Sequence, residues 1–464
     1  MDEGWRRAER AWRANEDDPQ AVELALAAAR RARQPVPLGL WDRRRSPARA
    51  FTSTRKFVVL VEREGEEDQE VGSTPGTVQV QECRAFWVRP KPARATAQVV
   101  EEVQREEAPC LSLERSHVDD EGMALLAPLG ARLLGLSLRT CLKLDPTALK
   151  RLERFPCLEE LNLSGAKGIN GDVLARVRDL TNLVQLSLAR STDLRDVDLH
   201  ALAGHPTLSR LLLDHTKLGD TKTGEAALAS LATLPRLEAL DLASCRKLRD
   251  PAVARLVREA PRLRRLVLRG SERLGDEVAA AIGASTTLRD VELLRCYALT
   301  AAGVAALARA PLERLGLAGH MKDEVARALA PLALSLRSLD ASYYSEERRH
   351  FGAEGVAALA RLANLEHLDL SHHGLDGTAL APLARLGRLR SLRLIGVRLE
   401  DATCLPPQLE SLTIEGRAAE ALARGTPPAL RRLEVRWEDG LSPVGRAALD
   451  ALTARGCEVV VSRF

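Results

Sequence analysis

Residues 133–138 read LLGLSL, and the same spacing of leucines, Leu-x-x-Leu-x-Leu, returns as LEELNL at 158–163, LVQLSL at 183–188 and LSRLLL at 208–213. After one longer step the pattern continues at intervals of roughly 24 to 29 residues, and then at about 20. The first leucines of these later units are Leu237, Leu263, Leu288, Leu312, Leu336, Leu365, Leu389, Leu409 and Leu430. Such a fixed period indicates an architecture of repeated structural units.

Each unit combines a short strand with a helix. Side chains alternate along a strand, so the last two leucines of a triplet project from one face while their neighbours face solvent. Apolar residues at three- and four-residue spacing predict a helix further on, for example over 146–154, 252–259 and 302–309. One unit cannot bury its leucines alone, whereas stacked units can. The sequence therefore predicts an α/β solenoid with a curved parallel sheet and outer helices.

The residue three positions past each triplet forms a second column. It reads Cys141, Ala166, Ser191, Thr216, Cys245, Ser271, Cys296, His320, Tyr344, His373 and Val397. From about residue 105 onward the triplets and this column resemble the leucine-rich repeat superfamily, in particular its ribonuclease-inhibitor-like and cysteine-containing subclasses. Family members often place Asn or Cys in this column to bond backbone groups. Because Asn is absent here, we expect thiols and hydroxyls to make those bonds. The resemblance implies protein recognition on the concave sheet and transfers no catalytic residue.

The N-terminal part follows other patterns. Trp5, Ala8 and Trp12 share one face of a predicted helix, and Asp18 before Pro19 predicts the start of a second helix. We expect residues 1–46 to form a helical hairpin, similar to a single tetratricopeptide-type unit, that docks on a neighbouring part of the chain. We expect residues 108–464 to form the repeat solenoid.

Between these parts, residues 47–107 read as strands followed by a helix over 96–107, with an exposed, mobile acidic loop from residue 62 to 76. These residues together with the hairpin make a small α+β region. We expect them to cap the end of the hydrophobic stack, as such arrays require. A separate binding module is the alternative.

Composition excludes several classes of partner. The chain has 68 basic and 64 acidic residues, a formal net charge of +4, which predicts no nucleic-acid or anionic-membrane partner. No apolar run is long enough for a secretory signal or a membrane span. The eight cysteines form no Cys-x-x-Cys pair and read as structural thiols of a reducing compartment. We therefore expect a cytoplasmic protein, and heavy use of Arg, Ala and Leu favours a bacterial source.

Catalytic motifs are not found in the sequence. It contains no phosphate-binding loop, no Gly-x-Ser-x-Gly and no His-Glu-x-x-His. The nearest approach to a metal site is His367, His372 and His373, with His320 and His350 as further candidates, but their positions on strand and loop need not converge. The prediction is therefore not an enzyme, with no cofactor, no metal site and no small-molecule substrate.

The predicted function is recognition of a protein partner on the concave face, which we expect to be free along its length. The residues predicted to bind are Asp241, Arg265, Arg269, Glu292, Arg314, Asp340, Tyr343, Asp369, His372 and Arg393. Tyr343, Tyr344, His372 and His373 form an aromatic patch that either anchors the partner or fills a wide turn. The alternative function is an adaptor or regulatory subunit whose residues 1–105 carry the output while the repeats sense a partner.

Overall fold

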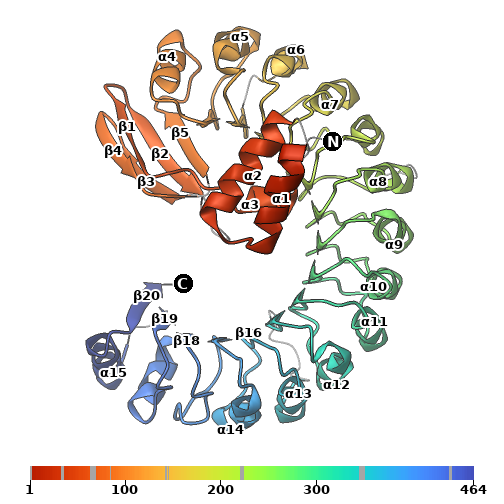
Figure 1. Ribbon diagram of the computed structural model, residues 1–464. Coiled ribbons are helices and arrows are strands. Elements are labelled where there is room, and N and C mark those ends of the chain that lie inside the picture. Colours follow the sequence, from red (N-terminus) through yellow and green to blue (C-terminus); the bar gives the residue numbers. More distant parts are fainter. Residues whose placement is uncertain are drawn as a thin grey trace. The chain divides into compact units, whose positions relative to one another are not determined.

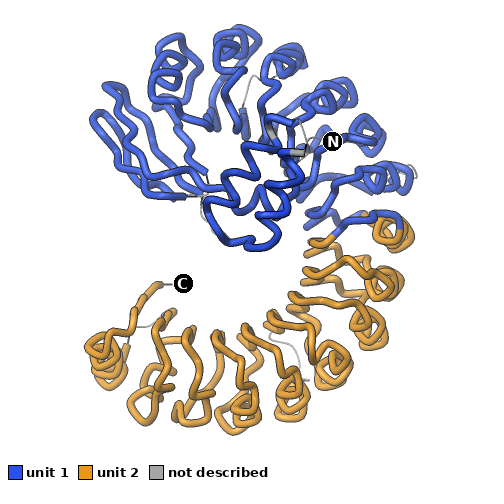
Figure 2. Tube along the Cα trace, viewed as in Figure 1, with its two compact units in different colours: residues 1–247, 259–263 blue, residues 248–258, 264–464 orange. Residues whose placement is uncertain are grey.

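The computed structural model describes residues 3–32, 36–62, 69–83, 85–141, 144, 146–219, 224–343, 351–437 and 441–463. By contacts between residues the chain divides into two compact units, coloured separately in Figure 2. Unit 1 comprises residues 1–247 and 259–263, and unit 2 comprises residues 248–258 and 264–464. Each unit is described by itself below.

Unit 1 begins with three helices, continues with five strands and then enters the repeats (Figure 1). Its elements are α1 (Glu3–Ala14), α2 (Pro19–Arg31), α3 (Leu38–Asp42), β1 (Arg49–Ser53), β2 (Phe57–Glu62), β3 (Gln69–Ser73), β4 (Gly76–Val80), β5 (Ala85–Pro90), α4 (Ala97–Arg105), β6 (Cys110–Ser112), α5 (Asp120–Leu126), η1 (Ala127–Leu129), β7 (Gly135–Ser137), α6 (Pro146–Lys150), η2 (Arg151–Arg154), β8 (Glu160–Asn162), α7 (Gly171–Arg178), β9 (Gln185–Ser187), η3 (Asp196–Leu202), β10 (Arg210–Leu212), α8 (Gly224–Ala232) and β11 (Ala239–Asp241).

The sheet of unit 1 joins the N-terminal strands to the repeats. β2 pairs with β3 and β5 in antiparallel fashion, β5 pairs with β6 in parallel, and β6 to β11 then follow in chain order, all parallel. β1 and β4 form a separate antiparallel pair. Because β5 pairs with the first repeat strand, the strands β2, β3 and β5 continue the repeat sheet.

Unit 2 contains repeats only. Its elements are α9 (Asp250–Glu259), β12 (Arg265–Val267), α10 (Asp276–Gly283), β13 (Asp290–Glu292), α11 (Ala301–Leu307), β14 (Arg314–Gly316), α12 (Asp323–Ala328), η4 (Ala330–Leu332), β15 (Ser338–Asp340), α13 (Ala353–Leu359), β16 (His367–Asp369), α14 (Gly377–Leu380), η5 (Ala381–Arg385), β17 (Ser391–Leu394), β18 (Ser411–Glu415), η6 (Gly416–Ala423), β19 (Arg432–Trp437), α15 (Pro443–Ala454) and β20 (Glu458–Arg463). Strands β12 to β20 pair in parallel in chain order.

Buried leucines hold the repeats together in register. Leu136, Leu161, Leu186 and Leu211 face one another on consecutive strands and are fully buried. In each unit the helices of the repeats lie on the outer side of the sheet, and we call the opposite side its inner face (Figure 1). The predicted α/β leucine-rich repeat solenoid is thus confirmed, as are the predicted helices, which correspond to α6 with η2, α9 and α11.

The thiols of the column past each triplet make the expected bonds, whereas the buried hydroxyl of Ser191 has no hydrogen-bond partner among the described residues. The thiols of Cys141, Cys245 and Cys296 donate to the carbonyls of Leu113, Leu213 and Leu268 at 3.1, 3.4 and 3.4 Å. Histidine takes the same role in later repeats: Nε2 of His320 accepts from the backbone N–H of Cys296 at 3.0 Å. Tyr344 of this column lies outside the described residues. Thiols and rings therefore replace the family's usual Asn.

The acidic stretch from 62 to 76 differs from the prediction. Instead of one loop, it contains β3 (Gln69–Ser73), which pairs with β2. The strand was missed because its polar side chains are mostly exposed and lack the expected apolar alternation. Residues 63–68 lie outside the described part, and the predicted boundaries at 46 and 107 stay predictions.

Candidate functional site

The inner face of unit 1 carries the N-terminal helices. Trp5, Trp12 and Trp41 of these helices form one apolar cluster with Val184 and Ala239, which belong to the repeat strands or precede them. Figure 1 shows α1 to α3 lying over this face. The expectation of a free inner face is therefore wrong for the strands β8 to β11, where the chain's own N-terminus covers it.

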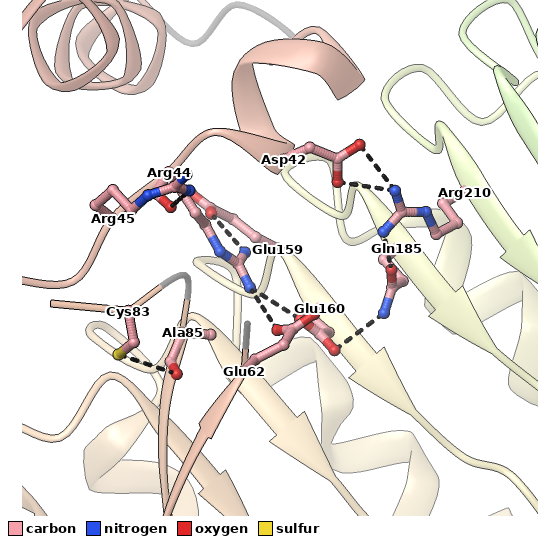
Figure 3. Close-up of polar contacts among 10 residues, drawn as sticks. All are labelled: Asp42, Arg44, Arg45, Glu62, Cys83, Ala85, Glu159, Glu160, Gln185 and Arg210. Atoms are coloured by element: carbon pink, nitrogen blue, oxygen red, sulfur yellow. Dashed lines mark hydrogen bonds and ion pairs between the residues drawn. The ribbon is translucent and has the colours of Figure 1, made fainter. Parts of the chain in front are cut away.

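A buried arginine anchors these helices (Figure 3). The Arg44 guanidinium lies 3.0 Å from a carboxylate oxygen of Glu160, 3.7 Å from Glu62 and 3.8 Å from Glu159. It also stacks over the ring of Trp41, 4.0 Å from the centroid. Burial alone lowers the pKa of Arg44, but Glu160 and the other carboxylates raise it above its ordinary value. The guanidinium stays charged and bridges the N-terminus to β2 and β8.

A second anchor lies beside the first. Both carboxylate oxygens of Asp42 accept from the Arg210 guanidinium at 2.8 Å, and Arg210 also donates to Gln185 at 2.9 Å. Gln185 in turn donates to Glu160 at 3.0 Å, so the two anchors form one connected chain of polar contacts (Figure 3). These side chains come from the first positions of β8, β9 and β10. The first positions of these strands therefore form the surface on which the N-terminal helices pack.

A cavity of about 410 Å³ lies beside this contact. Its wall combines apolar side chains of α2 and of the segment that precedes β7 with the charged side chains of residues 44, 45 and 49. Arg49 donates to the carbonyls of Glu106 and Glu107 at 2.5 and 3.3 Å. Cys110 also lines the cavity, and burial raises the pKa of its thiol well above the ordinary value, so this cysteine stays protonated.

The inner face of unit 2 carries a row of alternating charges on its first strands. Nε of Arg314 lies 2.9 Å from Asp290, and Arg265 lies 3.2 Å from Asp290 and 2.9 Å from Glu292. The two arginines are substantially exposed, with 61% and 48% of their side chains open to solvent, while Asp290 is buried. Asp290 links two of the predicted binding residues, Arg265 and Arg314. The sequence analysis missed it, although it occupies the same strand position as both arginines.

Further along the face, the charges pair in the same way. Arg393 lies 3.3 Å from Asp369 on the neighbouring strand, and Arg436 lies 2.8 Å from Glu434. Burial alone raises the pKa of Glu434, but the hydrogen bond and charge of Arg436 lower it below the ordinary value. Arg269, just past β12, is exposed and makes no ion pair within the described residues. Most of the predicted binding charges thus neutralise one another.

Three of the predicted binding carboxylates also shape the backbone. Asp241, Asp340 and Asp369 each accept from the backbone N–H two residues further on, at 2.8, 3.0 and 2.9 Å. This local bond is the turn that Asp side chains favour at the end of a strand. Asp241 belongs to unit 1 and lies on the same strand as Ala239, which the N-terminal helices cover.

The described residues of the aromatic patch differ in how deeply they are buried. His373 is buried, bonds the carbonyl of Ala341 through Nε2, and contacts the rings of Phe351 and Tyr343 at centroid distances of 4.6 and 5.7 Å. Burial lowers the pKa of His373, so its ring stays neutral. His372 is exposed, while Tyr343 is half-buried. The turn-filling alternative therefore holds for His373, and a recognition role remains a prediction for Tyr343 and His372.

The side chains show no arrangement for metal chemistry within the described ranges. No group of three or more His, Cys, Asp or Glu side chains there could hold a metal ion. His350 lies outside those ranges. The eight cysteines are free thiols, and burial raises the pKa of Cys245 to about 11 and that of Cys296 to about 12. Both thiols are therefore protonated and poorly nucleophilic.

No helix among the described residues is long and apolar enough to cross a membrane.

Comparisons with known proteins give structural likeness alone. No family model and no curated protein match the chain. Among solved structures, the chain is similar to an internalin from Listeria monocytogenes (TM-score 0.40, 16% identity, 78% of this chain and 88% of that chain covered). It is also similar to TLR13, solved as a TLR13–ssRNA13 complex (0.45, 17%, 81% and 52%), and to the yeast Rad7 and Elc1 complex (0.38, 16%, 76% and 88%). The leucine-rich repeat fold rests on this chain's own strands and buried leucines, while the subclass and the tetratricopeptide-type likeness stay predictions.

Proposed function

We propose that the chain is a non-catalytic recognition scaffold that binds a protein partner along the inner face of the unit 2 repeats. The observation that carries the proposal is the difference in exposure at the first strand position: the Arg210 side chain of β10 in unit 1 is 21% exposed, whereas the Arg314 side chain of β14 in unit 2 is 61% exposed. The proposed contact residues in unit 2 are Arg265, Arg269, Glu292, Arg314, Asp340, Tyr343, Asp369, His372 and Arg393. Asp241 of unit 1 is the remaining predicted residue.

The pairing of charges favours a protein over a nucleic acid on this face. A nucleic acid gains affinity by releasing its own condensed counterions when unpaired basic side chains neutralise its phosphates. Here the guanidinium groups of Arg265, Arg314 and Arg393 already face carboxylates at 2.9 to 3.3 Å. A mixed-sign surface with fixed geometry instead suits a partner that offers both charges in register, as protein interfaces do.

Site-specific photocrosslinking in the native cell tests this proposal. A photoreactive residue in place of Arg314 is expected to yield a covalent adduct that protease removes. The matched control replaces Arg327 of α12, which is 57% exposed on an outer helix, and is expected to yield none. An adduct removed by ribonuclease, or an adduct from the α12 position alone, would contradict the proposal.

The exposed part of the aromatic patch gives a second test in the same assay. Replacing Tyr343 and His372 together by alanine is expected to abolish the adduct formed at position 314, because tyrosine and histidine there supply amphipathic contact area. Thermal stability should change little, since His373 and Phe351 remain to fill the turn. An unchanged adduct yield would remove these two residues from the proposed interface.

The adaptor alternative requires N-terminal residues that act independently of the repeats. β5 pairs with β6, and Arg44 and Asp42 bind Glu160 and Arg210, so residues 1–105 would lose these contacts when separated. We therefore expect a fragment of residues 1–105 to be unfolded by circular dichroism. A folded fragment that binds its own partner would favour the adaptor.

A further inference from the structure

Six consecutive repeats of unit 1 each present one exposed basic side chain just past the carboxyl end of their strand. We call this row the basic ridge, and it consists of Arg115, Arg139, Lys167, Arg190, Lys217 and Arg246. The ridge residues lie beyond the carboxyl ends of the strands β6 to β11, in chain order. It is distinct from the proposed interface on unit 2.

A backbone ladder connects the repeats at this edge. The N–H of Arg115 donates to the carbonyl of Arg139 at 3.0 Å, and the N–H of Arg190 donates to the carbonyl of Asp214 at 2.8 Å. Arg115 and Arg190 stand at the same point in their repeats and have positive φ angles of 56° and 57°. The other ridge residues lie one or four positions past the last leucine of their triplets, so the ridge follows the repeats at about 4.8 Å per strand without sharing a single position.

The charge of the ridge is not compensated within the described residues. None of the six side chains has a carboxylate partner there, whereas the neighbouring Arg151 and Arg195 pair with Asp120 and Asp198 at 2.6 and 2.9 Å. Six unpaired cations exceed the net charge of the whole chain, which is +4.

The acidic side chains at the same edge already have partners. Glu114 lies 3.8 Å from Arg89, Asp214 lies 3.1 Å from His215, and Asp193 accepts from the backbone of Gly168 at 3.3 Å. Arg89 neutralises Glu114, but a backbone N–H carries no charge, so Asp193 keeps its negative charge near the ridge. The six cations still outnumber these carboxylates, and the ridge is a net positive strip on a nearly neutral protein.

The spacing and the surroundings of the ridge favour an extended acidic polypeptide. Alternate side chains of an extended peptide lie about 6.7 Å apart, a distance that flexible Arg and Lys side chains on a 4.8 Å ladder can match. Duplex nucleic acid carries about one charge per 1.7 Å, far more than the ridge can neutralise. Binding of single strands relies on stacking, and no Trp, Tyr or Phe side chain is exposed among the described residues of unit 1.

We propose that the basic ridge is a second docking site, which binds an extended acidic segment of a partner protein. Each repeat contributes one cation. Six strands about 4.8 Å apart span about 24 Å, which is the length occupied by about four alternate side chains of an extended acidic peptide. The site is independent of the inner face of unit 2 and would stand if that face had no partner.

Fluorescence anisotropy with the full-length protein tests the ridge. The probe is a labelled twelve-residue peptide of alternating Glu and Ser. The ridge variant combines Arg139→Glu, Lys167→Glu and Arg190→Glu, and the matched control combines Lys150→Glu, Arg176→Glu and Arg178→Glu, which are exposed on the outer helices α6 and α7. Both variants reverse one lysine and two arginines. We expect the ridge variant to weaken binding about tenfold or more and the control less than about twofold, at about 0.05 M salt.

Three outcomes would overturn the proposal. The first is a peptide that does not bind the intact protein. The second is an equal loss of affinity in both variants, since net charge alone would then explain binding. The third is a single-stranded RNA of the same charge that binds more tightly than the peptide and loses affinity in the ridge variant.

Discussion

Units 1 and 2 are built from the same leucine-rich strands, but their inner faces differ. In unit 1 the first strand positions hold Glu160, Gln185 and Arg210; Glu160 and Arg210 bind Arg44 and Asp42 of the N-terminal segment, and Gln185 links the two. In unit 2 the corresponding positions hold Arg265, Asp290 and Arg314, which pair with one another. Both units therefore share the backbone architecture of the repeats. A few inner-face side chains determine whether a face is covered by the chain itself or exposed to solvent.

Removing the anchor of unit 1 should have the largest effect. Arg44→Ala leaves Glu160, Glu159 and Glu62 without their buried cation, and breaking a buried ion pair in this way costs about 3–5 kcal/mol. Urea denaturation followed by circular dichroism measures the loss as a shift in midpoint. The double variant Arg44→Met with Glu160→Gln should recover part of it, because it removes charges of both signs. A midpoint unchanged in Arg44→Ala would show that Arg44 does not hold the N-terminal helices.

Acid should weaken unit 1 through one buried histidine. Burial lowers the pKa of His205 to about 4, and its Nδ1 accepts from the N–H groups of Thr207 and Leu208 at 3.3 and 3.1 Å. The unfolded chain therefore binds this proton more tightly, with a pKa near 6.5. Stability contributed by neutral His205 is complete above pH 6.5 and is lost toward pH 4, by about 3 kcal/mol in all.

The histidine prediction is checked by urea midpoints at several pH values between 7 and 4. His205→Gln should flatten the pH dependence of the midpoint in this window. Half-buried His320 and buried His373 of unit 2 also have lowered pKa values, so some slope should remain. A variant with the same slope as the intact protein would exclude His205 as the titrating group.

The smallest effect is expected on the exposed face. Arg314→Ala removes an ion pair whose arginine is largely open to water, and such pairs contribute about 0–1 kcal/mol. The urea midpoint should therefore change much less than in Arg44→Ala. A loss of stability as large as that of Arg44→Ala would mean that the two faces do not differ as described.

The fold could be predicted from the sequence because every repeat carries the same pattern of apolar residues. Leucine triplets, helix periodicity and the Cys, Ser and Thr column are local patterns, and each corresponds to buried contacts between adjacent repeats. The place of the N-terminal helices could not be predicted in this way. Arg44 and Glu160 are 116 residues apart, and Asp42 and Arg210 are 168 apart, so no period relates them.

The candidate site was predicted in part. Strand alternation placed Arg265, Glu292 and Arg314 on the inner face, but Asp290 between them was missed because a carboxylate there reads as one more solvated residue. One feature of the sequence does indicate which inner face is covered. Ala239 stands at a first strand position where unit 2 has charged or polar residues, and an apolar residue there indicates a packed neighbour.

Cysteine accessibility compares the two faces most directly. Ala239→Cys and Arg314→Cys occupy the same position in their repeats, and the rate of maleimide labelling at each is measured by mass spectrometry in the folded, full-length protein. We predict fast labelling at position 314 and labelling slower by at least about a hundredfold at position 239, where the N-terminal helices must move first. Equal rates at the two positions would contradict the account.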